Sequence, residues 1–206
     1  MRGFYLINWS RFYFIEMKPR DENKIDDIYR ATLHLVKEKG LSGITMGQIA
    51  KEAGLATGTV YIYFTNKDEL INTLFTTCRK GSAAIYFKGF DPAAPFRTGF
   101  RTIWMNVFRH RMEKFEEAIF LEQCMHCPFI TAGNREMANQ LMQPLFALVD
   151  RGKKEKKIRN IDTLLLLTSI IGSINEVNKH AHYTKRKLGK AELDEVFGLC
   201  WDGLKT

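Results

Sequence analysis

The stretch TMGQIAKEAGLATGTVYIYFTNKDEL at residues 45–70 decides the fold, because it encodes two short helices joined by a tight turn. Thr45 and Gln48 have the spacing of a capping box, in which each side chain satisfies a free backbone N–H of the first helical turn. Gly54 supplies the turn, and the second short helix is expected at 57–63. Two short helices around a glycine-containing turn, with a third helix packed across them, form a helix-turn-helix.

The second short helix has a small outer face that carries hydroxyl groups. Val60 and Phe64 are expected to anchor it to the core. Backbone amides at a helix N-terminus attract phosphate, and threonine or tyrosine hydroxyls bond to phosphates or base edges. This face therefore predicts DNA contacts by Thr57, Gly58, Thr59, Tyr61 and Ile62.

Helical periodicity continues on both sides of this stretch, and strand alternation is nearly absent. An amphipathic helix is expected over 22–39, ended by Gly40, and Asn66 begins a long helix over 67–88. Further helices are expected at 93–110, 112–126, 134–152, 160–181 and 190–204. Pro144 should kink or split the 134–152 helix. The sequence thus predicts an all-α fold of about nine helices.

Several short motifs within residues 22–75 resemble those of one known family. They are Ile28-Tyr-Arg-Ala31, Leu35, Gly40, Thr45-Met-Gly-Gln-Ile-Ala50, Ala53-Gly-Leu55, Thr57-Gly-Thr-Val-Tyr-Ile-Tyr-Phe64 and Asn66-Lys-Asp-Glu-Leu70. The whole set resembles the TetR family of repressors. The resemblance implies a homodimer in which three N-terminal helices bind double-stranded DNA, and the other helices bind a ligand and dimerise. We therefore expect an extension at 1–17, a DNA-binding domain at 18–66 and a ligand-binding and dimerisation domain at 67–206.

The resemblance also implies roles for residues beside the recognition face. Thr45 would cap the helix that approaches the phosphates, Tyr63 would lie near the recognition face, and Lys67 would meet phosphate. Two positions depart from the family pattern. Ala56 stands where many members have a serine, so the cap is expected to pass to Thr57. Gly47 stands where some members carry a long polar residue that reaches bases, and it has no side chain to read a base.

The net charge of +8 does not by itself identify a DNA-binding protein. Residues 18–80 carry an excess of only two basic residues, whereas residues 151–206 carry an excess of five. The basic run at 151–159 is interpreted as a solvated loop between helices, with a second nucleic-acid contact as the alternative. The DNA-binding prediction therefore depends on the motif.

The four cysteines are too few for a disulfide scaffold, and no apolar run reaches the length of a transmembrane helix. We therefore expect a cytoplasmic protein without a membrane partner. Residues 1–16 are rich in aromatics and precede Met17, which begins a conventional-looking start. They are interpreted as a dispensable extension, with an apolar arm that packs on a partner subunit as the alternative.

No constellation of catalytic or metal-binding residues stands out. Cys124 and Cys127 form one C-x-x-C without further ligands, which indicates buried structural thiols. The histidines lack metal-ligand spacing, and no nucleophile elbow or phosphate loop is present. We therefore expect neither an enzyme nor a cofactor nor a metal.

The segment 96–130 has more aromatic residues than a simple amphipathic helix needs, which is typical of an apolar ligand pocket. At least half of these aromatics should fill a dry core. Four-residue steps place three of them on one helix face. The candidates for the pocket lining are Phe100, Trp104, Phe108 and Phe120.

Two apolar stripes near the C-terminus predict the dimer interface, as a four-helix bundle across a two-fold axis. Their candidate residues are Ile170, Ile171, Ile174, Val177, Val196, Phe197 and Cys200. The sequence thus predicts a repressor that binds a pseudo-palindromic operator as a homodimer and is released by a small, largely apolar effector. The alternative is a constitutive DNA-binding protein or adaptor without an effector.

Overall fold

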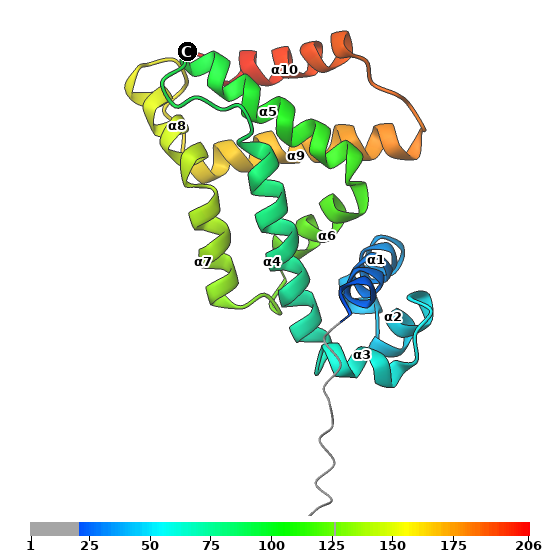
Figure 1. Ribbon diagram of the computed structural model, residues 1–206. Coiled ribbons are helices and arrows are strands. Elements are labelled where there is room, and N and C mark those ends of the chain that lie inside the picture. Colours follow the sequence, from blue (N-terminus) through cyan, green and yellow to red (C-terminus); the bar gives the residue numbers. More distant parts are fainter. Residues whose placement is uncertain (1–20, 126) are drawn as a thin grey trace, which may run out of the picture.

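The computed structural model describes residues 21–125 and 127–206, which form α-helices and no strand (Figure 1). The all-α prediction is therefore confirmed, while the extension at 1–17 lies outside the described residues. None of the helices in these ranges has the length and apolar character needed to cross a bilayer. The helices are α1 (Glu22–Lys39), α2 (Met46–Glu52), α3 (Thr57–Tyr63), α4 (Lys67–Tyr86), α5 (Phe96–Glu113), α6 (Phe115–Met125), α7 (Ala132–Leu141), α8 (Gln143–Lys154), α9 (Thr163–Tyr183) and α10 (Lys190–Leu204), with a 3₁₀ turn at Leu41–Gly43.

Local sequence signals explain where the helices begin and end. The capping box at the start of α2 is present: Gln48 N donates to Thr45 Oγ1 at 3.3 Å, and Thr45 N donates to Gln48 Oε1 at 2.9 Å. Gly54 has a φ of 67°, in the left-handed region that favours glycine. Pro144 splits the predicted 134–152 helix into α7 and α8, because proline is tolerated only in a first helical turn.

One helix start differs from the prediction. The N-cap of α3 is Ala56, which makes no side-chain hydrogen bond, and Thr57 is already the first helical residue. The expectation that Thr57 takes over the cap is therefore wrong. The Thr57 hydroxyl is instead exposed on the outer side of α3.

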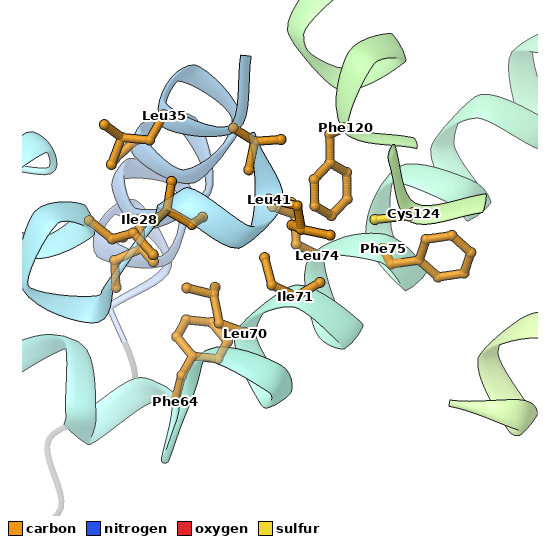
Figure 2. Packing of buried hydrophobic residues seen from close by; sticks show 14 of the residues in the cluster. Ile28, Leu35, Leu41, Phe64, Leu70, Ile71, Leu74, Phe75, Phe120 and Cys124 are labelled. Carbon is orange, nitrogen blue, oxygen red and sulfur yellow. The ribbon is translucent and has the colours of Figure 1, made fainter. Parts of the chain in front are cut away.

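The first hydrophobic cluster holds α1, α2 and α3 together and extends well past residue 66 (Figure 2). It includes Leu70, Ile71 and Leu74 of α4, and Phe120 and Cys124 of α6. A helix-turn-helix of short helices cannot bury enough apolar surface alone, so α4 and α6 complete its core. The predicted DNA-binding domain of residues 18–66 thus shares its hydrophobic core with α4 and α6, which follow it in the sequence.

The second cluster is built mainly from α5, α8, α9 and α10, and α4 joins the two clusters. In Figure 1, α4 runs from the helix-turn-helix to the layer formed by α5, α9 and α10. Its first half, up to Cys78, lies in the first cluster, and Tyr86 near its end lies in the second. One continuous helix therefore connects the surface beside α3 to the C-terminal core.

Gly152 is a point of close approach between α8 and α5, and we expect Gly152→Ala to destabilise the protein. A Cβ at this position would lie 2.4 Å from Phe96 Cε2. Such overpacking typically costs about 1–3 kcal/mol. The control is Gly81→Ala in α4, where a Cβ meets nothing within 4 Å and alanine should stabilise the helix by up to about 1 kcal/mol. Urea unfolding of both variants measures the difference, and equal stabilities would contradict the described packing.

Candidate DNA-binding surface and ligand cavity

The outer face of α3 is open to solvent. Tyr61 is 50% and Ile62 71% exposed, which is unusual for large side chains on a helix that packs on a core. A Cβ added to Gly58 would meet nothing within 4 Å, so no neighbouring group shields the start of the helix. Thr57 is exposed and Thr59 half-buried beside it. The structure thus brings the five predicted outer residues of α3 together on one accessible surface.

The inner face of α3 fixes this surface in place. Val60, Tyr63 and Phe64 are buried in the first cluster. Tyr63 was predicted among the DNA contacts, but its ring packs inward and its hydroxyl accepts a hydrogen bond from Asp21 N at 3.4 Å. The ring is therefore an anchor of α3, and a DNA contact by Tyr63 stays a prediction.

Lys67 occupies a different environment from the one predicted. Its ammonium donates to the backbone carbonyls of Ile44 at 3.1 Å and Leu41 at 3.4 Å, and lies 5.8 Å from the centre of the Phe129 ring. Lys67 thus ties the start of α4 to the segment that leads into α2. A phosphate contact by this side chain stays a prediction. Thr45 is exposed at the start of α2, as its capping role requires.

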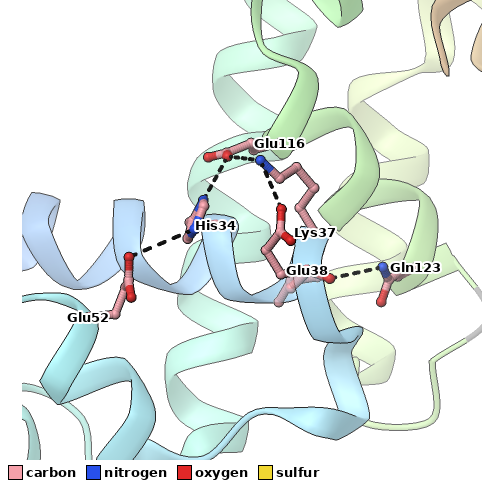
Figure 3. A network of polar contacts seen from close by, with 7 residues as sticks. His34, Lys37, Glu38, Glu52, Glu116 and Gln123 are labelled. Atoms are coloured by element: carbon pink, nitrogen blue, oxygen red, sulfur yellow. Dashed lines mark hydrogen bonds and ion pairs between the residues drawn. The ribbon is translucent and has the colours of Figure 1, made fainter. Parts of the chain in front are cut away.

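Figure 3 shows a polar network that joins α1 to α6. Glu116 Oε1 accepts from Lys37 Nζ at 2.8 Å and lies 3.2 Å from His34 Nδ1. Burial raises the pKa of Glu116, but the hydrogen bonds from Lys37 and His34 outweigh it and hold that pKa below its ordinary value. Gln123 adds a bond of 2.8 Å from Leu41 N. The network therefore attaches the helix-turn-helix to α6 by charge as well as by packing.

A mainly apolar, partly open cavity of about 240 Å³ lies between α4, α5, α7, α8 and α9. Phe100 and Trp104, two of the four predicted lining residues, are in its wall. Phe108 lies in the second cluster and Phe120 in the first, both fully buried away from the cavity. The prediction is wrong for these two because four-residue spacing shows which residues share a helix face, and not whether that face meets a cavity or a neighbouring helix.

The predicted dimer residues lie in or against the core of one protomer. Ile170, Ile174 and Phe197 are buried, and the other four, Ile171, Val177, Val196 and Cys200, pack partly buried against the same cluster. A buried side chain has no surface left for a partner, so Ile170, Ile174 and Phe197 belong to this protomer's core rather than to an interface. A partner contact by the four partly buried residues stays a prediction. Large exposed apolar side chains on these helices are Leu164, Leu165, Tyr183 and Leu199.

Sequence reasoning missed two arginines in the cavity wall, Arg79 of α4 and Arg111 of α5. A signal for Arg111 was present, because it follows Trp104 by seven residues and Phe108 by three on one helix face. An arginine within an apolar stripe is a charge placed toward the interior. Arg79 has no comparable signal in its local sequence.

The cysteines of the C-x-x-C are buried. Burial, with the nearby Cys127 as a smaller cause, raises the pKa of the Cys124 thiol to about 12, which disfavours the reactive thiolate. Across the described ranges, no three histidine, cysteine, aspartate or glutamate side chains gather where a metal ion could be held. Cys124 instead contributes to the first cluster beside Phe120 (Figure 2).

Two protein-family models match the chain. The model described as "Bacterial regulatory proteins, tetR family" matches residues 28–74, and the model described as "Tetracyclin repressor-like, C-terminal domain" matches residues 95–205. An uncharacterized HTH-type transcriptional regulator of Haemophilus influenzae is 35% identical over 92 residues, which are 45% of this chain and 49% of that protein. The chain thus matches about half the length of this relative.

Solved structures share the architecture over nearly the whole chain. A TetR family transcription regulator from Marinobacter aquaeolei VT8 has a TM-score of 0.80 and 25% identity, covering 90% of this chain and 97% of that one. The FadR regulator of Bacillus subtilis, solved in complex with stearoyl-CoA, has a TM-score of 0.62 and 20% identity, covering 86% of this chain and 98% of that one. The second likeness shows a shared fold alone.

Proposed function

Because the chain belongs to the TetR family of bacterial transcriptional regulators, we propose that it is a repressor that binds a pseudo-palindromic operator as a homodimer and releases it when a small, largely apolar molecule occupies its cavity. The family and the relatives matched are transcriptional regulators rather than enzymes. The observation that carries the proposal is that the outer face of α3 is exposed to solvent, while the inner face of the same helix is buried in the first cluster.

The chemistry of the α3 face suits contact with both phosphates and base edges. Thr57, Thr59 and Tyr61 offer hydroxyls, and Gly58 lets the backbone approach closely. Ile62 adds an apolar surface of the kind that contacts the methyl group of thymine. None of the five outer residues of α3 is charged, so hydrogen bonds and shape would carry much of the affinity on this face.

Release would follow from the position of α4. Arg79 and Tyr86 of this helix line the cavity, while its first half shares the first hydrophobic cluster with residues of α1 and α3. A ligand in the cavity therefore contacts the same rigid element that supports the recognition helix. It would release DNA if it favoured a conformation in which the two recognition helices of a dimer no longer match successive major grooves.

The homodimer would form through the outer faces of α9 and α10. Leu165 and Leu199 are 65% and 77% exposed, one on each helix. Both helices pack on α5, and large apolar side chains left in solvent are typical of a surface that a second subunit covers. The proposed interface lies on the same two helices as the interface predicted from the sequence, but it is centred on different, exposed residues.

We expect Tyr61→Ala to lower operator affinity by at least about 100-fold, because a dimer would lose two hydrogen bonds to charged groups. Fluorescence anisotropy with duplexes from the region upstream of the protein's own gene measures the affinity, and its salt dependence reports the phosphate contacts. Thr98→Ala, at an exposed residue of α5 that lies outside α3 and outside the proposed dimer helices, is the control. Parental affinity in a folded Tyr61→Ala variant would contradict the proposed surface. DNA binding that no cavity ligand changes would favour a constitutive regulator.

A further inference from the structure

Two arginines from different helices meet in the wall of the apolar cavity. Arg111 of α5 is only 3% exposed, and Arg79 of α4 is half-buried. The Nε atoms of both guanidinium groups are buried without a hydrogen-bond partner. The hydroxyl of Tyr86, in the same wall, is also buried without a partner. The cavity wall is therefore mainly apolar, with Asn139 and Thr168 as further polar residues, and the unpartnered donors of Arg79, Arg111 and Tyr86 form a polar corner in it.

The charge in this corner is not balanced by the part of the chain that the structure describes. No carboxylate there forms an ion pair with either arginine, and Arg111 Nη1 donates to the neutral amide of Asn175 at 2.7 Å. Arg79 lies 5.4 Å from the centre of the Phe75 ring, and its Nε has no hydrogen-bond partner among the described residues. Burial is the main cause that lowers the pKa of Arg79; Tyr86 acts in the opposite direction, and the neighbouring positive charge of Arg111 lowers that pKa further.

Two unpaired cations on an apolar wall are costly, because a buried charge needs an opposite charge and satisfied donors. Arginine forks match anionic oxygens with two parallel hydrogen bonds. We propose that the cavity binds an amphipathic anion, whose anionic oxygens lie between Arg79 and Arg111 and whose apolar body packs on Phe100 and Trp104. The effect of the anion on DNA binding rests on the proposed function, whereas the binding of the anion itself rests on the cavity alone.

Pairs of probes that share an apolar body and differ in head-group charge test the binding. Decanoate is compared with decanol, and 2-naphthoate with 2-naphthol, by calorimetry and tryptophan fluorescence on the full chain without DNA. Decyl phosphate distinguishes a phosphate from a carboxylate head group. We expect at least one anion to bind about 10-fold or more tightly than its neutral counterpart. No binding of any anion, or equal binding of the neutral partner, would overturn the proposal.

Arg79→Met separates a binding role from a structural one. Methionine keeps the packing on Phe75 and removes the charge. We expect about a 10-fold to 100-fold loss of affinity for the anion and little change for the alcohol. The ligand-free variant should also melt at a higher temperature, because an unpaired buried charge is gone. A structural arginine would instead give a lower melting temperature.

Arg109→Met is the matched control, because Arg109 is exposed on α5, two residues before Arg111. The Arg109→Met variant should bind the anion like the parent. If Arg79→Met still preferred the anion to its neutral counterpart, the assignment of Arg79 to the anion site would be overturned. DNA release is measured separately by anisotropy. Anion binding without DNA binding would reject the proposed function and keep this inference, whereas DNA binding without anion preference would do the reverse.

Discussion

Phe197→Ala should destabilise the protein by about 3–5 kcal/mol, as expected for truncating a fully buried aromatic side chain. Phe197 is 2% exposed, and its ring centre lies 5.5 Å from that of Trp104 and 6.1 Å from that of Phe100. The loss would be a large part of the stability of a typical domain. Urea unfolding followed by circular dichroism at several protein concentrations measures it.

Leu199→Ala, two residues further along α10, is the matched comparison. Leu199 is 77% exposed, so its truncation should affect the protein only through association. Any loss should therefore depend on protein concentration, and light scattering should show more monomer. A concentration-dependent loss in Phe197→Ala, with none in Leu199→Ala, would instead place the interface on the stripe predicted from sequence.

Phe120→Ala should also lower the free energy of unfolding by about 3–5 kcal/mol, mainly by weakening the contact between α6 and the helix-turn-helix. Phe120 is fully buried in the first cluster, between residues of α1 and α4 (Figure 2). Differential scanning calorimetry measures the change. If α1–α3 lose their support first, a separate low-temperature transition should appear.

The control for this variant is Phe129→Ala, because Phe129 is 38% exposed. It should lose clearly less stability than Phe120→Ala. Anion binding by Phe120→Ala, measured where the protein is still folded, should match the parent, since Phe120 lies outside the cavity. Selective loss of ligand affinity without loss of stability would restore Phe120 to the cavity wall.

The sequence predicted best those features that depend on residues close together in the chain. The capping box of Thr45 and Gln48, the turn at Gly54 and the break at Pro144 each follow from local backbone chemistry, and all are present. Most helix boundaries agree within a few residues for the same reason. The one wrong cap concerns α3: its N-cap residue is Ala56, and the helix begins there without a side-chain hydrogen bond.

The wrong residue assignments concern which element a buried face meets. The stripe with Ile170 and Ile174 is apolar whether it covers a partner subunit or this protomer's own cavity, so periodicity cannot distinguish the two. Phe108 and Phe120 fail similarly, since each is buried but in a different cluster. Arg111 was the more informative residue, because a charge within an apolar stripe needs a specific reason to be there.

The bond from Asp21 N to Tyr63 has a practical consequence for fusion proteins. It places Asp21 against α3, the helix predicted to enter the DNA groove, so a tag or reporter that replaces residues 1–20 would lie close to the operator. A polyhistidine or other charged tag there would add its own phosphate attraction and distort measured salt slopes. The C-terminus, where Thr206 Oγ1 donates to Lys156 O at 2.8 Å, lies at the opposite end of the molecule (Figure 1). Tags and surface-immobilisation handles therefore belong there.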